Sequence, residues 1–400
     1  MKHIVSDVPV TDIDIYGPEM VTAPHQQWEK IRAEGNIVYA SKNQAFYVTS
    51  HPLVQRIISD WRVFTSSKGI GIRDLDDYDP PRIPSLLLET DPPEHDKFRK
   101  IMMKVLSAEN IARLRTSFEE AACRLVDDAV KAKRFDGLAD LVQPFTLNVI
   151  ADAVGVPKQG RKHLLHYGAM IVEASGPNNY RFHNARDRAR QAGSIEWVAT
   201  MMKRGSLTDI GFAAEIFAFV DSGDISETEA ELLVRIFLNA SVDSTVGSIV
   251  NGVKLLAERP QSYEQLRSDP SLIRTTFEET ARYHGVVKHL VRTASVDVEI
   301  EGQKIRAGQK IALGLGAANR DPAKFDNPDV FDITRRSAGH VGFGVGTHAC
   351  AGQMMARLEA DVLYRTLLQK VKGISIKGNV VPLDSNAFTT WARLPLEVEV

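Results

Sequence analysis

The sequence predicts a mainly α-helical protein with a small β component at each end of the chain. Three observations support this fold class. Long stretches with helical apolar periodicity begin with recognisable caps, and the segments that alternate between apolar and polar residues are few and short. No repeat, low-complexity tract or Gly-, Ser- or Pro-rich linker divides the 400 residues. Although this length would suffice for two or three domains, we predict a single domain over residues 1–400.

The predicted strands lie in two groups, one near the N-terminus and one in the last part of the chain. In each segment apolar and polar residues roughly alternate, which is typical of strands with one buried face. The segments are Ile37–Tyr39, Phe46–Thr49, Val296–Ile300, Lys310–Leu313 and Leu396–Val400.

One helix is predicted to begin at Asp91-Pro92-Pro93-Glu94. This tetrapeptide offers an acidic N-cap, a proline in the first turn and a glutamate at the third position. The helix then places His95 and Arg99 four residues apart on one face. It also carries three lysines that line one face: Lys97, Lys100 and Lys104.

A longer helix is predicted from the capping box Ser226–Glu229 to the stop at Pro260. It exceeds the roughly 8–20 residues typical of globular helices, so we expect it to cross the whole domain. Its centre, 240–245, reads Ala-Ser-Val-Asp-Ser-Thr, and polar residues there compete with the backbone for hydrogen bonds. Arg235, Asn239 and Asp243 recur at i, i+4 and i+8 and are expected to share a face.

Composition excludes several classes of protein. The hydrophobic content of 44% and charged content of 25% are ordinary for a globular chain. A formal net charge of -2 gives no general attraction to nucleic acid or to a membrane. Residues 1–20 contain charges and no apolar run, so we expect neither a signal peptide nor a membrane anchor. Two cysteines without a disulfide pattern indicate a reducing compartment, and we predict a cytoplasmic location.

The most informative segment is 343–352, which places Cys350 in a glycine-rich loop at the start of a periodic helix. A thiolate at the positive end of a helix has a lowered pKa and is a good ligand or nucleophile. Gly344, Gly346 and Gly352 leave room for a flat, bulky group to approach the backbone.

Three simpler roles for Cys350 fit the sequence less well. A structural zinc site needs about four Cys or His ligands, and Cys123 is the only other cysteine. A Cys–His nucleophile would leave the glycines unexplained. An inert buried cysteine does not require so specific a context.

The pattern F-G-x-G-x-H-x-C-x-G-x-x-x-A-R, from Phe343 to Arg357, resembles the cysteine-ligand loop of the cytochrome P450 family. These proteins are heme-thiolate monooxygenases, and the resemblance is to their soluble bacterial type. It implies the triangular P450 fold, bound heme b, and Cys350 as the axial ligand of its iron.

The resemblance extends to other residues. Glu279 and Arg282 match the E-x-x-R motif of the family, and the match continues through 318–322 to Arg335. These three residues are expected to form a buried ion triad that supports the cysteine loop, whereas the motif alone would suggest a surface ion pair. The heme propionates are expected to bind four residues that otherwise suggest solvated side chains: His95, Arg99, Arg292 and His348.

The middle of the long helix resembles the family's proton-delivery segment. There Asp243 matches the acid and Ser244 stands at the alcohol position, where the family usually has threonine. Ser241 occupies the usual glycine position. Serine lacks the methyl group that restrains χ1, so we predict less efficient coupling, and a peroxide-driven variant stays open.

Arg82 and Ser85 precede the propionate-binding helix, in the loop that covers the distal pocket in this family. Together with Arg235 and Asn239 they are expected to contact substrate; a solvated loop and a structural ion pair are the alternatives for the two arginines. The chain is similar to the branch that oxidises para-substituted benzoates and methoxy-aromatics, which implies hydroxylation or O-demethylation of a small aromatic with O2 and two electrons. The alternatives are a hydroxylase of a bulkier terpenoid or fatty acid and, remotely, a non-catalytic heme sensor.

The chain contains no flavin or nicotinamide fingerprint and no room for a reductase domain. The resemblance therefore implies an iron–sulfur ferredoxin and an NAD(P)H-dependent ferredoxin reductase as partners. Lys97, Lys100 and Lys104 are expected to dock an acidic ferredoxin, and the alternative is an ordinary solvated face.

Overall fold

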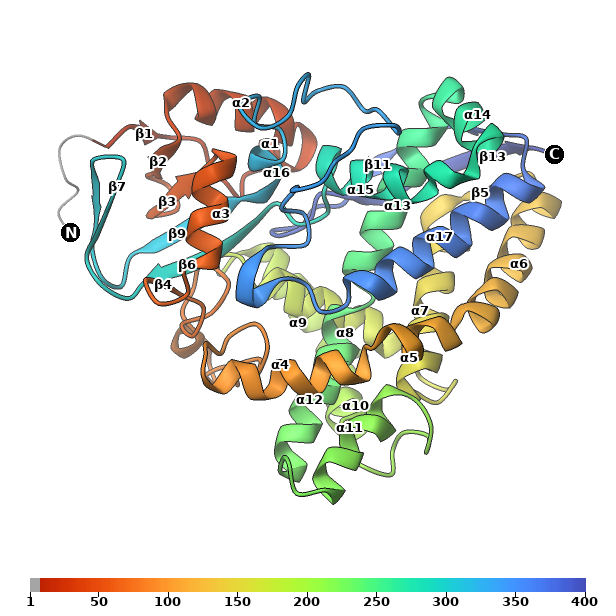
Figure 1. The fold of residues 1–400 in the computed structure, drawn as a ribbon, viewed down its shortest axis with the longest axis horizontal. Coiled ribbons are helices and arrows are strands. Elements are labelled where there is room, and N and C mark those ends of the chain that lie inside the picture. Colours follow the sequence, from red (N-terminus) through yellow and green to blue (C-terminus); the bar gives the residue numbers. More distant parts are fainter. Residues whose placement is uncertain (1–7) are drawn as a thin grey trace.

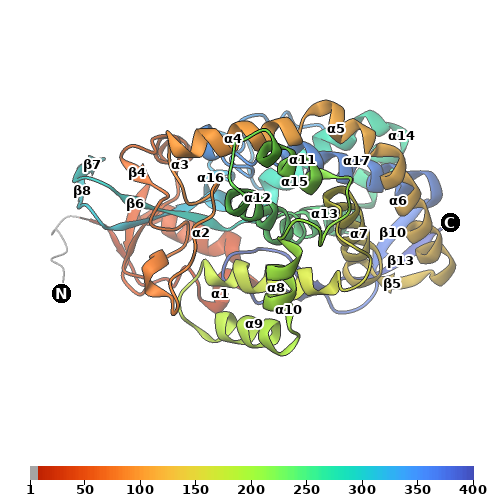
Figure 2. The same ribbon diagram turned by 90° about the horizontal axis from the view of Figure 1, so that it is seen from below.

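The computed structural model describes residues 8–400. The molecule is a flat triangle with most of its strands at one end, a smaller group of strands near the C-terminus at the opposite end, and helices between them (Figures 1 and 2). The helices are α1 (Pro18–Thr22), α2 (Pro24–Glu34), α3 (His51–Ser59), α4 (Glu94–Val105), α5 (Ala108–Arg113), α6 (Arg115–Ala132), α7 (Gln143–Val154), α8 (Lys162–Ala174), α9 (Tyr180–Gln191), α10 (Ser194–Met201), α11 (Phe212–Asp221), α12 (Glu227–Ala240), α13 (Asp243–Ala257), α14 (Pro260–Ser268), α15 (Ile273–Tyr283), α16 (Leu315–Ala318) and α17 (Gln353–Lys370).

The strands are short, as predicted. They are β1 (Val10–Thr11), β2 (Ile37–Ala40), β3 (Ala45–Val48), β4 (Phe64–Thr65), β5 (Arg134–Asp136), β6 (His289–Ala294), β7 (Val298–Ile300), β8 (Gln303–Ile305), β9 (Lys310–Gly314), β10 (Gly373–Ile376), β11 (Val381–Pro382), β12 (Trp391–Arg393) and β13 (Pro395–Glu399). All five predicted strands are confirmed within two residues at each end.

The principal sheet has six strands in the order β1-β2-β3-β9-β6-β4. Its strand β6 was not predicted from the sequence. Five of its six residues are buried, so they show no alternation of apolar and polar side chains. A second sheet, β10-β13-β5, joins the C-terminal strand to a segment more than half the chain away.

The predicted long helix is two helices. α12 ends at Ala240 and α13 begins at Asp243; α12 rises from the lower tip of the molecule and α13 continues through its centre (Figure 1). At the break, the hydroxyl of Ser241 donates to the carbonyl of Phe237, and that of Ser244 donates to the carbonyl of Ala240 at 3.0 Å. Such bonds from serine to the preceding turn bend helices. Arg235 and Asp243 therefore lie on different helices.

The stretch 227–257 is also the one segment of the described chain long and apolar enough to span a membrane, with a mean hydropathy of 1.3 in its most apolar window. Slightly more than half of that window, 56%, is buried inside the protein. The apolar faces of α12 and α13 belong to the largest hydrophobic core, together with side chains of α7, α15 and α17. The core explains the apolar composition of this stretch.

The start of α4 also differs from the prediction. Its N-cap is Pro93, and Asp91 does not cap it. The Asp91 carboxylate instead accepts hydrogen bonds from Thr65 and Ser66 and contacts His348 Nε2 at 3.0 Å. Asp91 was predicted to cap α4, but its side chain instead connects its own segment to Thr65–Ser66 and to His348.

Candidate heme site

The cysteine loop is held in shape by its own backbone. The N–H of Cys350 donates to the carbonyl of Phe343 at 2.8 Å, which closes the loop before α17 begins. Gly344 and Gly346 have φ angles of 65° and 70°, in the left-handed region that side chains disfavour. A Cβ on Gly346 would also lie 3.1 Å from the backbone of Ser59. These two glycines are therefore required by the fold of the loop.

Cys350 faces a cavity of about 360 Å³. The cavity is bounded by the cysteine loop, by the break between α12 and α13, and by the loop 82–89. Most of its lining is apolar, including Ile150, Val154, Phe212, Ile236, Phe237 and Phe388. The Cys350 side chain borders this enclosed space and not the outer surface of the protein.

Cationic and imidazole side chains gather beside the loop. Arg99 donates to the carbonyl of Ala349 at 2.7 Å, and the rings of His95 and His348 are 4.7 Å apart. Arg292 is 2% exposed, and within residues 8–400 the one hydrogen bond of its guanidinium goes to the carbonyl of Val291 at 3.1 Å. Burial lowers the pKa of Arg292 to about 10, although nearby Asp91 partly offsets the effect.

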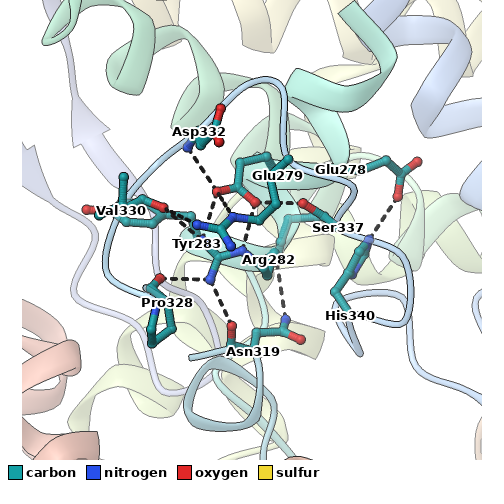
Figure 3. A network of polar contacts seen from close by, with 12 residues as sticks. Glu278, Glu279, Arg282, Tyr283, Asn319, Pro328, Val330, Asp332, Ser337 and His340 are labelled. Atoms are coloured by element: carbon teal, nitrogen blue, oxygen red, sulfur yellow. Dashed lines mark hydrogen bonds and ion pairs between the residues drawn. The ribbon is translucent and has the colours of Figure 1, made fainter. Parts of the chain in front are cut away.

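The Glu279–Arg282 pair forms as predicted (Figure 3). All five guanidinium N–H groups of Arg282 find acceptors: two bonds of 2.7 and 2.8 Å reach Glu279, and three reach the carbonyls of Asn319, Pro328 and Val330. Arg335 Nε also donates to Glu279, at 3.2 Å. The pair is fully buried, so its hydrogen bonds tie α15 to the segment before the cysteine loop.

Asp243 lies at the start of α13 and lines the cavity. Its Oδ2 is buried with no hydrogen-bond partner in the described part of the chain, and it lies against Gly168, where a Cβ would approach it to 2.3 Å. Burial, with a smaller contribution from Glu173, raises the pKa of Asp243 to about 7. Ser244 also lines the cavity, but its hydroxyl is bonded to Ala240 as described above.

The loop 82–89 brings Arg82, Ser85 and Glu89 to the cavity wall, and Asn239 of α12 joins them. Arg82 Nη2 lies 3.4 Å from the buried carboxylate of Glu89. Arg235 is not part of this wall, contrary to its predicted contact with substrate. It donates to the carbonyls of Ile83 and Pro84 at 3.2 and 2.9 Å and thereby fastens the loop to α12.

Residues 206–388 match the sequence profile of the family described as Cytochrome P450. A curated protein of Rhodopseudomonas palustris, cytochrome P450 CYP199A2, is 39% identical over 392 residues, which cover 98% of this chain and 95% of that protein. The chain belongs to the cytochrome P450 family. It is a heme-dependent monooxygenase, as the cysteine loop predicted.

More distant relatives support the same family and fold. The biotin biosynthesis cytochrome P450 of Bacillus subtilis is 29% identical, with 90% of this chain and 91% of that protein covered. The structure of cytochrome P450 CYP109Q5 from Chondromyces apiculatus superposes with a TM-score of 0.82 at 25% identity, covering 98% and 99% of the two chains. The predicted P450 fold, mainly α with a small β part, is confirmed.

P450 proteins bind heme b through an axial cysteine thiolate, which is the role of Cys350. Burial raises the pKa of this thiol, opposed by backbone N–H groups of Gly352 and Gln353 and by the charges of Arg99 and Arg357. The N–H groups at the start of α17 lower the pKa as predicted, but burial outweighs them, so the net shift of the free thiol is upward. Coordination to a metal ion deprotonates a thiol directly, so the ligand is the thiolate.

The residues beside the P450 cysteine loop fit an anionic cofactor. Among the described residues, His95 Nε2 has no hydrogen-bond partner and the guanidinium of Arg292 bonds only to a neighbouring carbonyl, so buried donors outnumber their acceptors there. Two carboxylates of heme would satisfy such groups. His348 differs from the prediction, since Asp91 and the carbonyl of Leu87 already engage its two ring nitrogens.

One residue of this site was not predicted from the sequence. Glu359 of α17 lines the cavity, and both of its carboxylate oxygens are buried with no hydrogen-bond partner among residues 8–400. Burial raises its pKa well above the ordinary range, opposed in part by nearby Thr146. The only sequence signal is its acidic character on the apolar face of a helix.

Proposed function

We propose that this P450 hydroxylates or O-demethylates a small aromatic compound of the methoxybenzoate or methoxyphenol type, as a single domain over residues 1–400. The observation that carries the proposal is the cavity, which is apolar apart from a few polar groups such as Arg82, Ser85 and Asn239. Cys350, Arg99 and His348 line the same cavity, so heme and substrate share its volume of about 360 Å³, and the substrate occupies the part bounded by Arg82, Ser85 and Asn239.

The charged residues of the cavity wall affect how a methoxybenzoate and a methoxyphenol would bind. Glu89 compensates the charge of Arg82, and its own oxygen Oε2 accepts the N–H of Ser85 at 3.0 Å. A benzoate would compete with Glu89 for Arg82, whereas a methoxyphenol needs only hydrogen-bonding groups such as Ser85 and Asn239. Both types therefore belong in the test.

In the proposed reaction, one oxygen atom of O2 enters a C–H bond of the substrate, and the other leaves as water after uptake of two electrons and two protons. An aryl methyl ether hydroxylated on its methyl carbon becomes a hemiacetal, which collapses to a phenol and formaldehyde. Heme b supplies the oxygen chemistry, and its thiolate ligand pushes electron density toward the iron. The protein orients the substrate and delivers the protons.

Proton delivery is assigned to Asp243 and Ser244. A carboxyl group whose pKa is raised to about 7 by burial can both hold and release a proton at neutral pH. Its free Oδ2 provides the oxygen atom for that exchange. The Ser244 hydroxyl keeps acceptor capacity for a water while it donates to Ala240.

We propose that electrons arrive from an iron–sulfur ferredoxin reduced by an NAD(P)H-dependent reductase, in the cytoplasm. Both cysteines are free thiols, which is typical of a reducing compartment. Lys100 and Lys104 are exposed on α4, the helix whose Arg99 contacts the cysteine loop. Lys97 is less suited to docking because Glu229 already pairs with it at 2.8 Å.

The substrate proposal predicts that methoxy-aromatics convert the ferric P450 from low to high spin. The titration would compare 4-methoxybenzoate with neutral methoxyphenols and a terpenoid. We expect Arg82→Gln to weaken benzoate binding about tenfold and leave phenol binding unchanged, because a hydrogen bond to a charge contributes about 1.5–3 kcal/mol. A spin change with the phenols alone would exclude the contact between Arg82 and a substrate carboxylate. No spin change with either aromatic set would exclude the proposed substrate class.

The docking proposal predicts that reduction by a ferredoxin slows steeply as ionic strength rises. Lys100→Glu and Lys104→Glu should each slow the first electron transfer about tenfold at low salt, because like charges disfavour the encounter. The matched control is Lys42→Glu, an exposed lysine between β2 and β3. A stopped-flow rate of reduction that is insensitive to salt and to both α4 variants would contradict the assigned surface.

A further inference from the structure

Glu278 neighbours Glu279 on α15 but serves a different set of partners. Its carboxylate contacts His340 Nε2 at 2.8 Å and accepts two hydrogen bonds from Arg357 of α17, one of them at 3.2 Å. Figure 3 shows Glu278 and His340 joined beside the Glu279–Arg282 pair and separate from it. Two consecutive carboxylates of one helix thus bind different segments of the chain.

These contacts are well shielded from solvent. The side chains of Glu278, His340 and Arg357 are 18%, 6% and 19% exposed. Burial alone would raise the pKa of Glu278, but the hydrogen bonds from His340 and Arg357 outweigh it and lower the pKa to about 2. Glu278 is therefore ionised at neutral pH, and its bonds are stronger than those of an exposed ion pair.

The His340 ring connects Glu278 to the backbone of the cysteine loop. His340 Nδ1 accepts the N–H of Gly342 at 3.1 Å, so the ring proton lies on Nε2 and is donated to Glu278. A Cβ on Gly342 would lie 2.9 Å from the carbonyl oxygen of Ala281 and 3.1 Å from the ring. The backbone at Gly342 is thus held between the imidazole and α15.

Arg357 connects the same carboxylate to the next residue of the loop. Its guanidinium carbon lies 4.8 Å from the centroid of the Phe343 ring, and the ring of His340 lies 5.7 Å from that centroid. The Phe343 carbonyl in turn accepts the N–H of Cys350. Glu278 therefore reaches the cysteine through two consecutive residues, Gly342 and Phe343.

We propose that Glu278, His340 and Arg357 form a positioning network that keeps the Cys350 loop in the geometry required for thiolate ligation of the heme iron. The three residues act on the loop and are assigned no contact with substrate or cofactor, so they are positioning residues. Their task is distinct from that of the Glu279 triad, which holds the preceding segment. Groups that orient a metal ligand tune the bond between ligand and metal.

The test uses the purified heme-loaded protein and the carbon monoxide difference spectrum of its ferrous form, which separates thiolate-ligated from inactive species. We expect Glu278→Gln and His340→Ala to speed conversion to the inactive species about tenfold, within the range for residues that orient metal ligands. We also expect a shifted ferric/ferrous midpoint potential, because the electron density at the sulfur changes with its geometry.

Three further variants separate positioning from general stability. Asp361→Asn changes a half-buried carboxylate of α17 that pairs with Arg115 of α6 and with Arg365 of α17, and it should leave the spectrum and potential unchanged. His340→Asn retains an acceptor near Gly342, and His340→Gln retains a donor near Glu278. We expect the Asn variant to restore the spectrum better, because Gly342 belongs to the loop.

A purely structural role would lower the melting temperature of the variants without changing the conversion rate or the potential. Wild-type values of both quantities in Glu278→Gln and in the His340 variants would overturn the proposal. If Glu278→Gln does not fold, His340→Asn and His340→Gln still test the proposal. Both variants carry a neutral amide, and the shorter Asn keeps the contact with Gly342 whereas the longer Gln keeps the contact with Glu278.

Discussion

Replacement of Arg282 by alanine is expected to yield heme-free or insoluble protein. Glu279 is fully buried and would lose two of its five hydrogen-bond donors, while the carbonyls of Asn319, Pro328 and Val330 would each lose one. Removing one partner of a buried ion pair costs about 3–5 kcal/mol, a large share of the roughly 5–15 kcal/mol that stabilises a folded domain. Heme content per protein and the soluble yield measure the effect.

The matched control for this prediction is Arg274→Ala, which removes an exposed arginine from the same helix. It should retain full heme loading. Lysine at position 282 is not a sufficient replacement, because its ammonium cannot make five bonds in the plane of the guanidinium. Normal heme loading in Arg282→Ala would refute the structural role of the triad.

Replacement of Asp243 by asparagine is expected to slow product formation roughly a hundredfold, the lower range for loss of an acid–base group. The amide occupies the same space against Gly168 but cannot carry the exchanging proton. Substrate-induced spin change should survive, because the cavity keeps its shape. The rate of product formation and the ratio of product to NADH consumed are the quantities to measure.

The same assignment predicts how the rate of product formation depends on pH. The wild-type rate should fall as pH rises through about 7, since the proton-donating form of Asp243 disappears there. The raised pKa also favours the folded state most below pH 3.8, and this stabilisation is lost as pH rises through about 7. In Asp243→Asn both dependences should be absent.

Glu258→Gln, at the exposed end of α13, is the control. It should retain the wild-type rate and pH profile. Ser244→Thr would test the separate prediction that product formation is inefficiently coupled to NADH consumption. Near-complete coupling in the wild-type protein would contradict that prediction. An unchanged pH profile in Asp243→Asn would remove Asp243 from the proton path.

Local signals in the sequence were reliable where a structure depends on neighbouring residues. The capping box at Ser226 and Glu229 forms as predicted, with the Ser226 N–H donating to the Glu229 carboxylate at 2.8 Å. The short alternating strands also formed where predicted. The same reasoning was wrong for Asp91, because a carboxylate near a helix start can be claimed by a distant segment, here Thr65, Ser66 and His348.

The central helix shows a second limit of sequence reasoning. The polar residues at 241–245 interrupt its apolar pattern, but helical periodicity resumes on both sides of them, so the sequence predicts one continuous helix. The break becomes visible only in the hydrogen bonds of Ser241 and Ser244 to the preceding turn. Because of the break, Arg235 does not share a face with Asp243 and instead fastens the loop 82–89.

The sequence by itself determined the fold class, because helix caps and apolar periodicity are local signals that recur along the chain. It also determined the heme ligand Cys350 and the identity of the Glu279–Arg282 pair, because each lies within one continuous motif. Tertiary structure alone decided which groups are buried and which segments meet. Burial raised the pKa of Asp243 and of the Cys350 thiol, and the packing of α15 and α17 against the cysteine loop brought Glu278, His340 and Arg357 together. Desolvation and contacts between distant segments arise only when the whole chain has folded, so a local pattern does not contain them.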